Sequence, residues 1–177
     1  MLITVLFASP RADGVTARLT EAFLSNCPTG AEIRRFDAYE MAVAPCIACN
    51  TCEKTGSCVM HDTDEFLSAC GQSDVLLLAT PVYNYSVPAP LKALFDRLQP
   101  LFAKPAHNPE SARRKGFLLV VCGASGLYSF DIVTRQVKNA FSELGFTLCG
   151  TAEAPLTDTV GLTDEELCKA KELAALI

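Results

Sequence analysis

Three stretches of the chain are almost continuously apolar, and they constrain the fold more than any other feature. They are LITVLFA at 2–8, DVLLLAT at 74–80 and GFLLVVCG at 116–123. Such runs are typical of strands that are buried on both faces, as in a parallel sheet. Parallel strands need a long crossover between them, which is usually a helix. We therefore expect strands to alternate with helices along the chain.

The segments between these runs follow that alternation. Weaker strand patterns at 31–38 and 146–153 predict an edge strand and a last strand. Helical patterns occupy about 17–26, 63–71, 90–102, 130–144 and 163–176. Asp62 or Thr63 is a candidate cap for the second helix, and Thr163 with Glu166 forms a capping box for the last. The order predicts an α/β fold, with a parallel sheet and helices on both faces.

Length, composition and charge suit one compact domain. The chain has 177 residues, is 50% hydrophobic and contains no linker rich in Gly, Ser or Pro. We expect a single domain over 1–177, with a Cys-rich loop inserted at about 42–61. The net charge is −5 and no basic footprint is present, which argues against a nucleic-acid partner. The short basic cluster at 113–115 is expected to be solvated.

The sequence predicts a cytoplasmic protein with no membrane partner. The first run lacks the early Lys or Arg of a signal peptide, and no apolar stretch is long enough for a membrane span. The nine cysteines, an odd number, argue against a disulfide framework. Five of them are scattered, and we interpret these as small buried hydrophobic residues: Cys27, Cys70, Cys122, Cys149 and Cys168.

In a sheet of this kind a ligand lies beyond the carboxyl ends of the strands, so the loop at 9–16 is a candidate site. Ser9 and Thr16 supply hydroxyl groups, Arg11 a cationic fork, and Gly14 close backbone approach at a helix start. These features suit a phosphate monoester, although an ordinary strand-to-helix turn is the alternative. The loop has neither the ending of a Walker loop nor the GxGxxG pattern.

Two later loops offer groups that suit a flat, partly polar ring. The loop PVYNYS at 81–86 places two tyrosines after a buried strand, and GASG at 123–126 contains two glycines. The tyrosines would otherwise cover the edge of the core. The candidate residues are Pro81, Val82, Tyr83, Asn84, Tyr85, Ser86, Gly123, Ala124, Ser125 and Gly126.

Four more cysteines form a compact cluster with the spacing C-x2-C-x2-C-x5-C, at Cys46, Cys49, Cys52 and Cys58. Zinc sites usually bring together two separated pairs of ligands. Three cysteines in consecutive steps are more typical of the turn around one corner of a [4Fe–4S] cluster. Cys58 would close the same cluster, with Gly56 allowing the bend. Reduced thiols, a redox switch and zinc remain alternatives.

Together these segments resemble the flavodoxin-like NAD(P)H-dependent FMN reductases. The resemblance is carried by SPRADGVT at 9–16, by the cysteine loop and by TPVYNYSVPAPLKALFDR at 80–97. It is greater to the iron–sulfur flavoprotein branch, which has the same compact cysteine spacing. The resemblance implies a three-layer flavodoxin-like fold, with a five-stranded parallel sheet in the order 2-1-3-4-5, and noncovalently bound FMN.

By the same resemblance, Ser9, Arg11 and Thr16 match the phosphate-binding positions. The range 81–86 matches the loop at the isoalloxazine ring and ribityl chain, and 123–126 matches the third flavin-side loop. The chain departs from the family at two positions. Val15 stands where Asn is usual, and Ala48 replaces a common Gly between the first two cysteines.

The function implied is an FMN-dependent oxidoreductase that passes electrons between FMN and a [4Fe–4S] cluster. NAD(P)H is a candidate donor, the partner is a small-molecule or protein electron carrier, and the assembly is a homodimer or homotetramer. No catalytic acid or base is predicted, because electron transfer requires none, and His61 and His107 are expected on the surface. The alternatives are a cluster-free reductase of FMN or quinone and a non-enzymatic metal-binding module, since fold alone does not choose among them.

Overall fold

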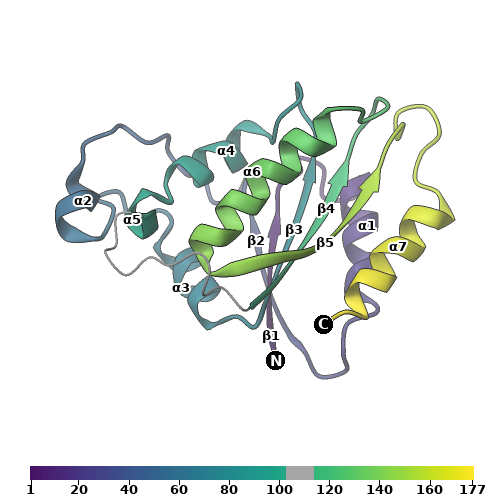
Figure 1. The fold of residues 1–177 in the computed structure, drawn as a ribbon, viewed down its shortest axis with the longest axis horizontal. Coiled ribbons are helices and arrows are strands. Elements are labelled where there is room, and N and C mark those ends of the chain that lie inside the picture. Colours follow the sequence, from purple (N-terminus) through teal and green to yellow (C-terminus); the bar gives the residue numbers. More distant parts are fainter. Residues whose placement is uncertain (103–113) are drawn as a thin grey trace.

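The structure, a computed structural model, describes residues 1–102 and 114–177. The strands of its sheet are β1 (Leu2–Phe7), β2 (Glu32–Asp37), β3 (Val75–Pro81), β4 (Arg114–Val121) and β5 (Phe146–Ala154). They are all parallel and lie in the order β2-β1-β3-β4-β5 (Figure 1). The predicted α/β fold and strand order are confirmed.

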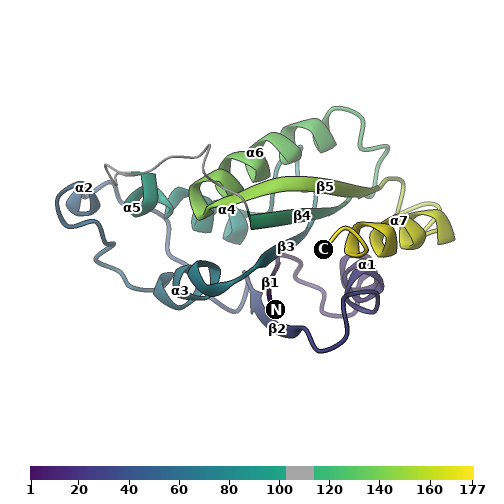
Figure 2. The ribbon, with the colours of Figure 1, turned by 60° about the horizontal axis from the view of Figure 1, so that its bottom comes forward.

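Helices cover both faces of this sheet, as Figure 2 shows. One face carries α1 (Val15–Leu24) and α7 (Asp164–Ala174), and the other carries α3 (Asp64–Gln72), α4 (Ala89–Asp96) and α6 (Ser129–Leu144). In β3, Leu76 and Leu78 pack toward α3, α4 and α6, whereas Val75 and Leu77 pack toward α1 and α7. Both faces of the strand are therefore apolar, which explains the continuous run. Within the described ranges no helix has the length and apolarity to cross a membrane.

The predicted helix at 90–102 is two helices. After α4 ends at Asp96, a short helix α5 (Gln99–Phe102) begins. Pro100 explains the break, because it has no N–H to donate to the Asp96 carbonyl and its ring would clash there. The cysteine segment also differs from the expected loop, since it contains a short helix, α2 (Thr51–Thr55).

The predicted loop at 103–115 and strand at 116–123 need one correction, because β4 already begins at Arg114. The rest of that loop, with His107 and Arg113, lies outside the described residues. The capping box of α7, between Thr163 and Glu166, is present. At the start of α3, Thr63 occupies the cap position but makes no side-chain capping bond.

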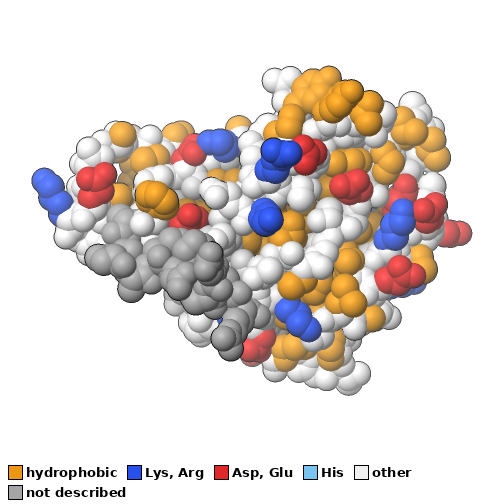
Figure 3. Space-filling view, in the orientation of Figure 1, with side chains coloured by type: hydrophobic (Ala, Val, Ile, Leu, Met, Phe, Trp, Pro, Cys, Tyr) orange, Lys and Arg blue, Asp and Glu red, His pale blue; other side chains and the backbone are white. Residues whose placement is uncertain are grey.

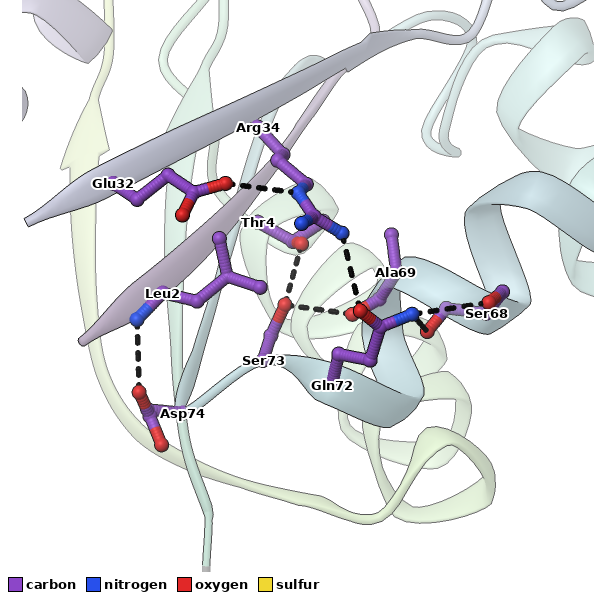
Figure 4. A network of polar contacts seen from close by, with 9 residues as sticks. All are labelled: Leu2, Thr4, Glu32, Arg34, Ser68, Ala69, Gln72, Ser73 and Asp74. Atoms are coloured by element: carbon purple, nitrogen blue, oxygen red, sulfur yellow. Dashed lines mark hydrogen bonds and ion pairs between the residues drawn. The ribbon is translucent and has the colours of Figure 1, made fainter.

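A polar network fastens the end of α3 to the amino ends of β1 and β2 (Figure 4). The hydroxyls of Thr4 and Ser73 lie 2.6 Å apart, and Ser73 donates to the Ala69 carbonyl at 2.8 Å. At the surface, Arg34 donates to the Gln72 side chain at 3.4 Å. Thr4 is fully buried, so its hydrogen bond removes the cost of an unpaired polar group. These contacts hold the end of α3 against the amino ends of β1 and β2.

Arg114 was expected to be solvated, and that prediction is wrong. Its guanidinium lies 4.1 Å from the centroid of the Phe146 ring. It donates to main-chain carbonyls at the ends of α3 and α6, at 2.5 Å to Cys70, 3.1 Å to Ser73, 2.8 Å to Leu144 and 3.2 Å to Gly145. The basic group therefore compensates two helix C-termini that meet only in the folded chain. Lys115 is exposed, as expected.

The scattered cysteines are only partly buried, and all nine cysteines of the chain are free. Cys70 and Cys122 are buried and Cys27 is half-buried, but Cys149 and Cys168 are exposed. The prediction of burial is wrong for the last two. Cys149 lies on the edge strand β5 and Cys168 on α7, where part of each element faces solvent.

Candidate cofactor sites

The carboxyl ends of β1, β3 and β4 are neighbours in the sheet, so the three loops predicted to bind a ligand follow strands at one edge (Figure 1). A cavity of about 320 Å³ opens at this edge. Its wall includes candidate residues from two of the loops, namely Val82, Asn84, Tyr85, Gly123, Ala124, Ser125 and Gly126. The sheet order thus brings together residues that lie far apart in the sequence.

The same cavity has lining residues that sequence reasoning missed. They are Cys122, Leu127, Ser129 and Asp158. Asp158 comes from the loop after β5, and a Cβ added at Gly123 would lie only 2.1 Å from its Oδ2 atom. Its backbone N–H also donates to the Gly123 carbonyl at 3.3 Å. The available signal was the strand order, because the end of β5 adjoins that of β4.

The loop after β3 forms a tight turn that holds Tyr85 at the cavity. Tyr83 and Ser86 exchange backbone hydrogen bonds of 2.9 and 3.0 Å, and the two residues between them have positive φ, 49° at Asn84 and 61° at Tyr85. A two-residue turn of this kind normally has glycine at the second central position. Tyrosine there is strained, and strain of this sort is concentrated at functional sites. The Tyr85 side chain is 61% exposed.

The other candidates in this loop do not line the cavity. Pro81 is the last residue of β3 and is buried. Tyr83 is 40% exposed. The Ser86 hydroxyl turns to α6 and lies 3.3 Å from the Gln136 side-chain oxygen.

The loop after β1 retains the features expected of a phosphate site. Ser9 is buried, and its hydroxyl accepts a hydrogen bond of 3.3 Å from the Arg11 N–H. Gly14 precedes α1 without a side-chain cap, and a Cβ there would lie 3.1 Å from the Arg11 Cβ. Thr16 follows in the first turn and is buried. The first N–H groups of a helix in this arrangement are suited to an anion.

The four clustered cysteines line a second cavity, of about 380 Å³, between the cysteine segment and the residues that join α4 to α5. Cys46 and Cys49 are exposed, whereas Cys52 and Cys58 are half-buried. In the part of the chain that the structure describes, no three Cys, His, Asp or Glu side chains are close enough to share a metal ion. The four thiols therefore line one cavity, but they are not arranged to bind a single metal ion together.

Arg97, to which the sequence suggested no role, is buried in the wall of this second cavity and is 1% exposed. Its Nη1 donates to the Ala44 carbonyl at 2.8 Å and to Asp62 at 3.1 Å, and its Nη2 donates to Asp62 at 2.5 Å. The available signal was helical spacing, because Arg97 follows Leu94 by three residues on the core-facing stripe. A charged residue at such a position is expected to be buried with a partner.

Arg97 and Asp62 each shift the pKa of the other in the direction that favours its charged form. Burial alone would raise the pKa of Asp62, but hydrogen bonds from Arg97 and the Ala44 N–H lower it overall. Burial alone would lower the pKa of Arg97, but its hydrogen bonds with Asp62 and the proximity of Cys58 raise it. Both groups therefore remain charged at neutral pH.

The backbone of the cysteine segment reflects its departure from the family pattern. Ala48 has a φ of 51°, in the left-handed region that favours glycine. An L-residue pays about 1–2 kcal/mol there. The glycine that is common at this position would remove that strain. His61 is exposed, as expected, and its Nδ1 lies 2.7 Å from an Asp64 carboxylate oxygen.

The two cavities lie at opposite ends of α4. The loop at 82–88 precedes this helix and Arg97 follows it. An eight-residue helix is about 12 Å long, at about 1.5 Å per residue. Figure 1 shows the same separation, with α2 at the left end of the molecule and the carboxyl ends of the central strands at the top.

A parallel sheet in this order, with a cavity beyond its carboxyl edge, defines the class of flavodoxin-like proteins. Within that class, the profile of the NADPH-dependent FMN reductase family matches residues 1–158. The chain belongs to this family. The prediction of an FMN-dependent oxidoreductase is confirmed.

Individual relatives agree with this assignment. The chain is 36% identical over 150 residues to an iron–sulfur flavoprotein of Methanocaldococcus jannaschii, covering 80% of this chain and 72% of the relative. It is 28% identical over 174 residues to an iron–sulfur flavoprotein of Archaeoglobus fulgidus, covering 97% and 76%. The solved NAD(P)H:quinone oxidoreductase of Methanothermobacter marburgensis has the same fold, with a TM-score of 0.71 at 21% identity over 98% of this chain and 94% of that one.

Proposed function

We propose that this FMN-dependent oxidoreductase is an electron-transfer flavoprotein whose second cavity holds a [4Fe–4S] cluster. The observation that carries the proposal is that Cys46, Cys49, Cys52 and Cys58 line one cavity together with the buried Arg97. Thiolates are the ligands of such clusters, and a buried cation offsets their negative charge. The relatives of M. jannaschii and A. fulgidus are named iron–sulfur flavoproteins.

The first cavity and the neighbouring loop after β1 are the proposed FMN site. Ser9, Arg11, Thr16 and the first turn of α1 would hold the phosphate. Asn84 and Tyr85 would flank the ring, and the backbone at 123–126 would approach it closely. When bound, FMN supplies the exchange between two-electron and one-electron chemistry. The chain's own residues orient the cofactor and exclude water from one side of it.

The arrangement of the two sites favours a homodimer or homotetramer. The sites of one chain are separated by the length of α4, so a second subunit offers a shorter route between them. Leu127 of the first cavity's lining is 66% exposed, and the next residue, Tyr128, is 74% exposed. Figure 3 shows orange side chains gathered in this part of the surface, near the start of α6. Such a patch is suited to a subunit interface.

The environment proposed for the protein is the cytoplasm, because nine free cysteines suit a reducing compartment. The electron donor is NAD(P)H or a reduced carrier protein, and the acceptor is a quinone or a similar compound.

A cluster-free reductase is the second candidate. It is favoured by the spacing of the thiols, which do not converge within the described residues. In that case FMN would pass electrons directly from NAD(P)H to a quinone, and the cysteines would be free thiols or bind zinc.

The test is the composition and spectrum of protein purified without exposure to air. Wild type is expected to show flavin bands over a broad brown absorbance, with about four irons and four sulfides per chain. Cys46→Ala should lose the iron and keep the FMN, whereas Cys149→Ala, at an exposed cysteine outside the second cavity, should keep both. Light scattering on the same sample measures the molar mass and so tells a monomer from a homodimer or homotetramer.

Flavin without iron or sulfide in such a sample would support the cluster-free reductase. Zinc at one equivalent per chain would assign the cysteines to zinc. Loss of FMN along with iron in Cys46→Ala would make the segment structural.

A further inference from the structure

We propose that Arg97 is a positioning residue that tunes the centre bound in the cysteine cavity. Its guanidinium is a fixed, buried cation that stabilises the reduced centre and so raises its reduction potential. This inference rests on the proposed function, that the cavity holds a [4Fe–4S] cluster.

The guanidinium is held rigidly where it lies. Asp62 accepts two hydrogen bonds from it, the Ala44 carbonyl accepts a third at 2.8 Å, and Met60 Sδ lies 2.9 Å from Nη1. Arg97 is 1% exposed, so it has no route to solvent without breaking these contacts. A charge fixed in this way needs no reorganisation when an electron arrives.

One polar atom of Arg97 is left without a partner. The Nε atom is buried and has no hydrogen-bond partner among the described residues. Leaving a buried donor unpaired is costly, and such atoms are rare enough in native proteins to require an explanation. A ligand in the cavity that Arg97 lines, bearing thiolate and sulfide acceptors, would supply the missing acceptor.

The pair of Arg97 and Asp62 is neutral overall, but its two ends are placed differently. Arg97 is part of the described lining of the cavity, whereas Asp62, which accepts its hydrogen bonds, is not. The pair is therefore a dipole with its positive end toward the cysteines. The other charged residues of the described lining, Glu53 and Asp96, are acidic, and Asp96 is paired with Lys92 at 2.5 Å.

The effect on potential follows from charge. An oxidised [4Fe–4S] core carries 2+, and four thiolates bring the site to −2. With such a cluster bound, reduction would add one electron from an external reductant and bring the site to −3, with no proton and no bond change. A nearby positive end stabilises −3 more than −2, and the potential of such clusters responds to charge and to hydrogen bonds at sulfur.

The test is the midpoint potential of the cluster, measured by EPR during an anaerobic titration with dithionite. Arg97→Gln should lower the equilibrium constant for reduction at least tenfold, which is about 59 mV for one electron. Asp62→Asn removes the negative charge paired with Arg97 and should shift the potential upward. Lys54→Gln removes an exposed cation of the same segment, outside the cavity lining, and should shift the constant less than threefold because solvent screens it.

Opposite shifts in Arg97→Gln and Asp62→Asn would support the proposal, because structural damage would not change sign with the charge removed. A shift in Arg97→Gln no larger than that of Lys54→Gln would overturn it. If Arg97→Gln fails to load a cluster, Asp62→Asn alone tests the proposal. In that case a midpoint potential that does not rise in Asp62→Asn would overturn the positioning role of Arg97. Loss of iron from both variants with FMN retained would make Arg97 structural. Wild-type protein without iron would instead refute the proposed function itself.

Discussion

Two exposed cysteines show how single neighbours set thiol chemistry in this chain. The Thr51 N–H and hydroxyl lower the pKa of Cys49, and Arg97 adds to the effect. On α7, a hydrogen bond with the Glu172 carboxylate, 3.5 Å from the Cys168 sulfur, raises the pKa of Cys168. At one pH near neutrality, Cys49 therefore has the larger thiolate fraction. The sequence placed Cys49 in the cysteine cluster and Cys168 among the scattered cysteines, but it gave no signal for this difference in pKa.

We expect alkylation of the metal-free protein to follow this difference. Because the thiolate is the reactive form, iodoacetamide should modify Cys49 severalfold faster than Cys168 at neutral pH. Peptide mass spectrometry over a time course measures both rates in one sample. Glu172→Gln should accelerate Cys168 and leave Cys49 unchanged, and equal rates in the wild type would contradict the assignment.

At the scale of elements, the loops at the carboxyl edge work as a packed unit. The loop at 155–160 is tied to that at 122–124, because Leu156 N–H donates to the Ala124 carbonyl at 2.7 Å and Thr157 N–H to the Cys122 carbonyl at 3.1 Å. The side chain of Asp158, from the loop at 155–160, packs directly against the Cα of Gly123 in the other loop. A side chain at Gly123 would therefore move Asp158 and reshape the cavity.

Gly123→Ala is expected to weaken FMN binding. The added Cβ would lie 2.1 Å from Asp158 Oδ2, so the loop must shift, and we expect the Kd for FMN to rise about tenfold, or about 1.4 kcal/mol. Quenching of FMN fluorescence on titration with apo-protein measures the Kd. The matched control is Gly71→Ala in α3, where a Cβ meets no atom within 4 Å, and its Kd should equal that of the wild type. Equal Kd values for both variants would remove Gly123 from the FMN site.

In the molecule as a whole, one arginine at the start of β4 links two helices, α3 and α6, to the neighbouring strand β5. Arg114 starts β4, donates to carbonyls at the ends of α3 and α6, and stacks on Phe146 of β5. Its neighbour Lys115 is exposed and reaches the C-terminal end of the chain, where Nζ donates to the Leu176 and Ile177 oxygens at 2.6 and 3.0 Å. The adjacent basic residues thus have different roles.

We expect Arg114→Met to cost about 3 kcal/mol of unfolding free energy, because helix-end carbonyls lose a charged donor. Lys115→Met should cost less than about 1 kcal/mol, as is usual for an exposed ionic contact. Urea denaturation followed by circular dichroism measures both. Equal losses would show that the part-buried contacts of Arg114 contribute no more than surface ones.

The order of strands and helices, and the edge of the sheet at which we propose FMN to bind, could be predicted from local patterns in the sequence. Apolar runs, helical periodicity and turn residues are local signals. A continuous apolar run indicates a strand that is buried on both faces, and an apolar residue every three or four positions indicates a helix. Loops after the strands must then follow the carboxyl edge of a parallel sheet. The capping box of α7 and the edge position of β2 were predictable for the same reason.

Which polar residues are buried, and which partners they have, became apparent from the folded structure alone. Arg97 meets Asp62 across 35 residues of chain, and Arg114 meets Cys70 across 44. Asp158 joins the first cavity, and the four cysteines share the second with Arg97. A charged side chain looks the same in sequence whether it is solvated or paired. The energy that decides between these states comes from partners brought close by folding.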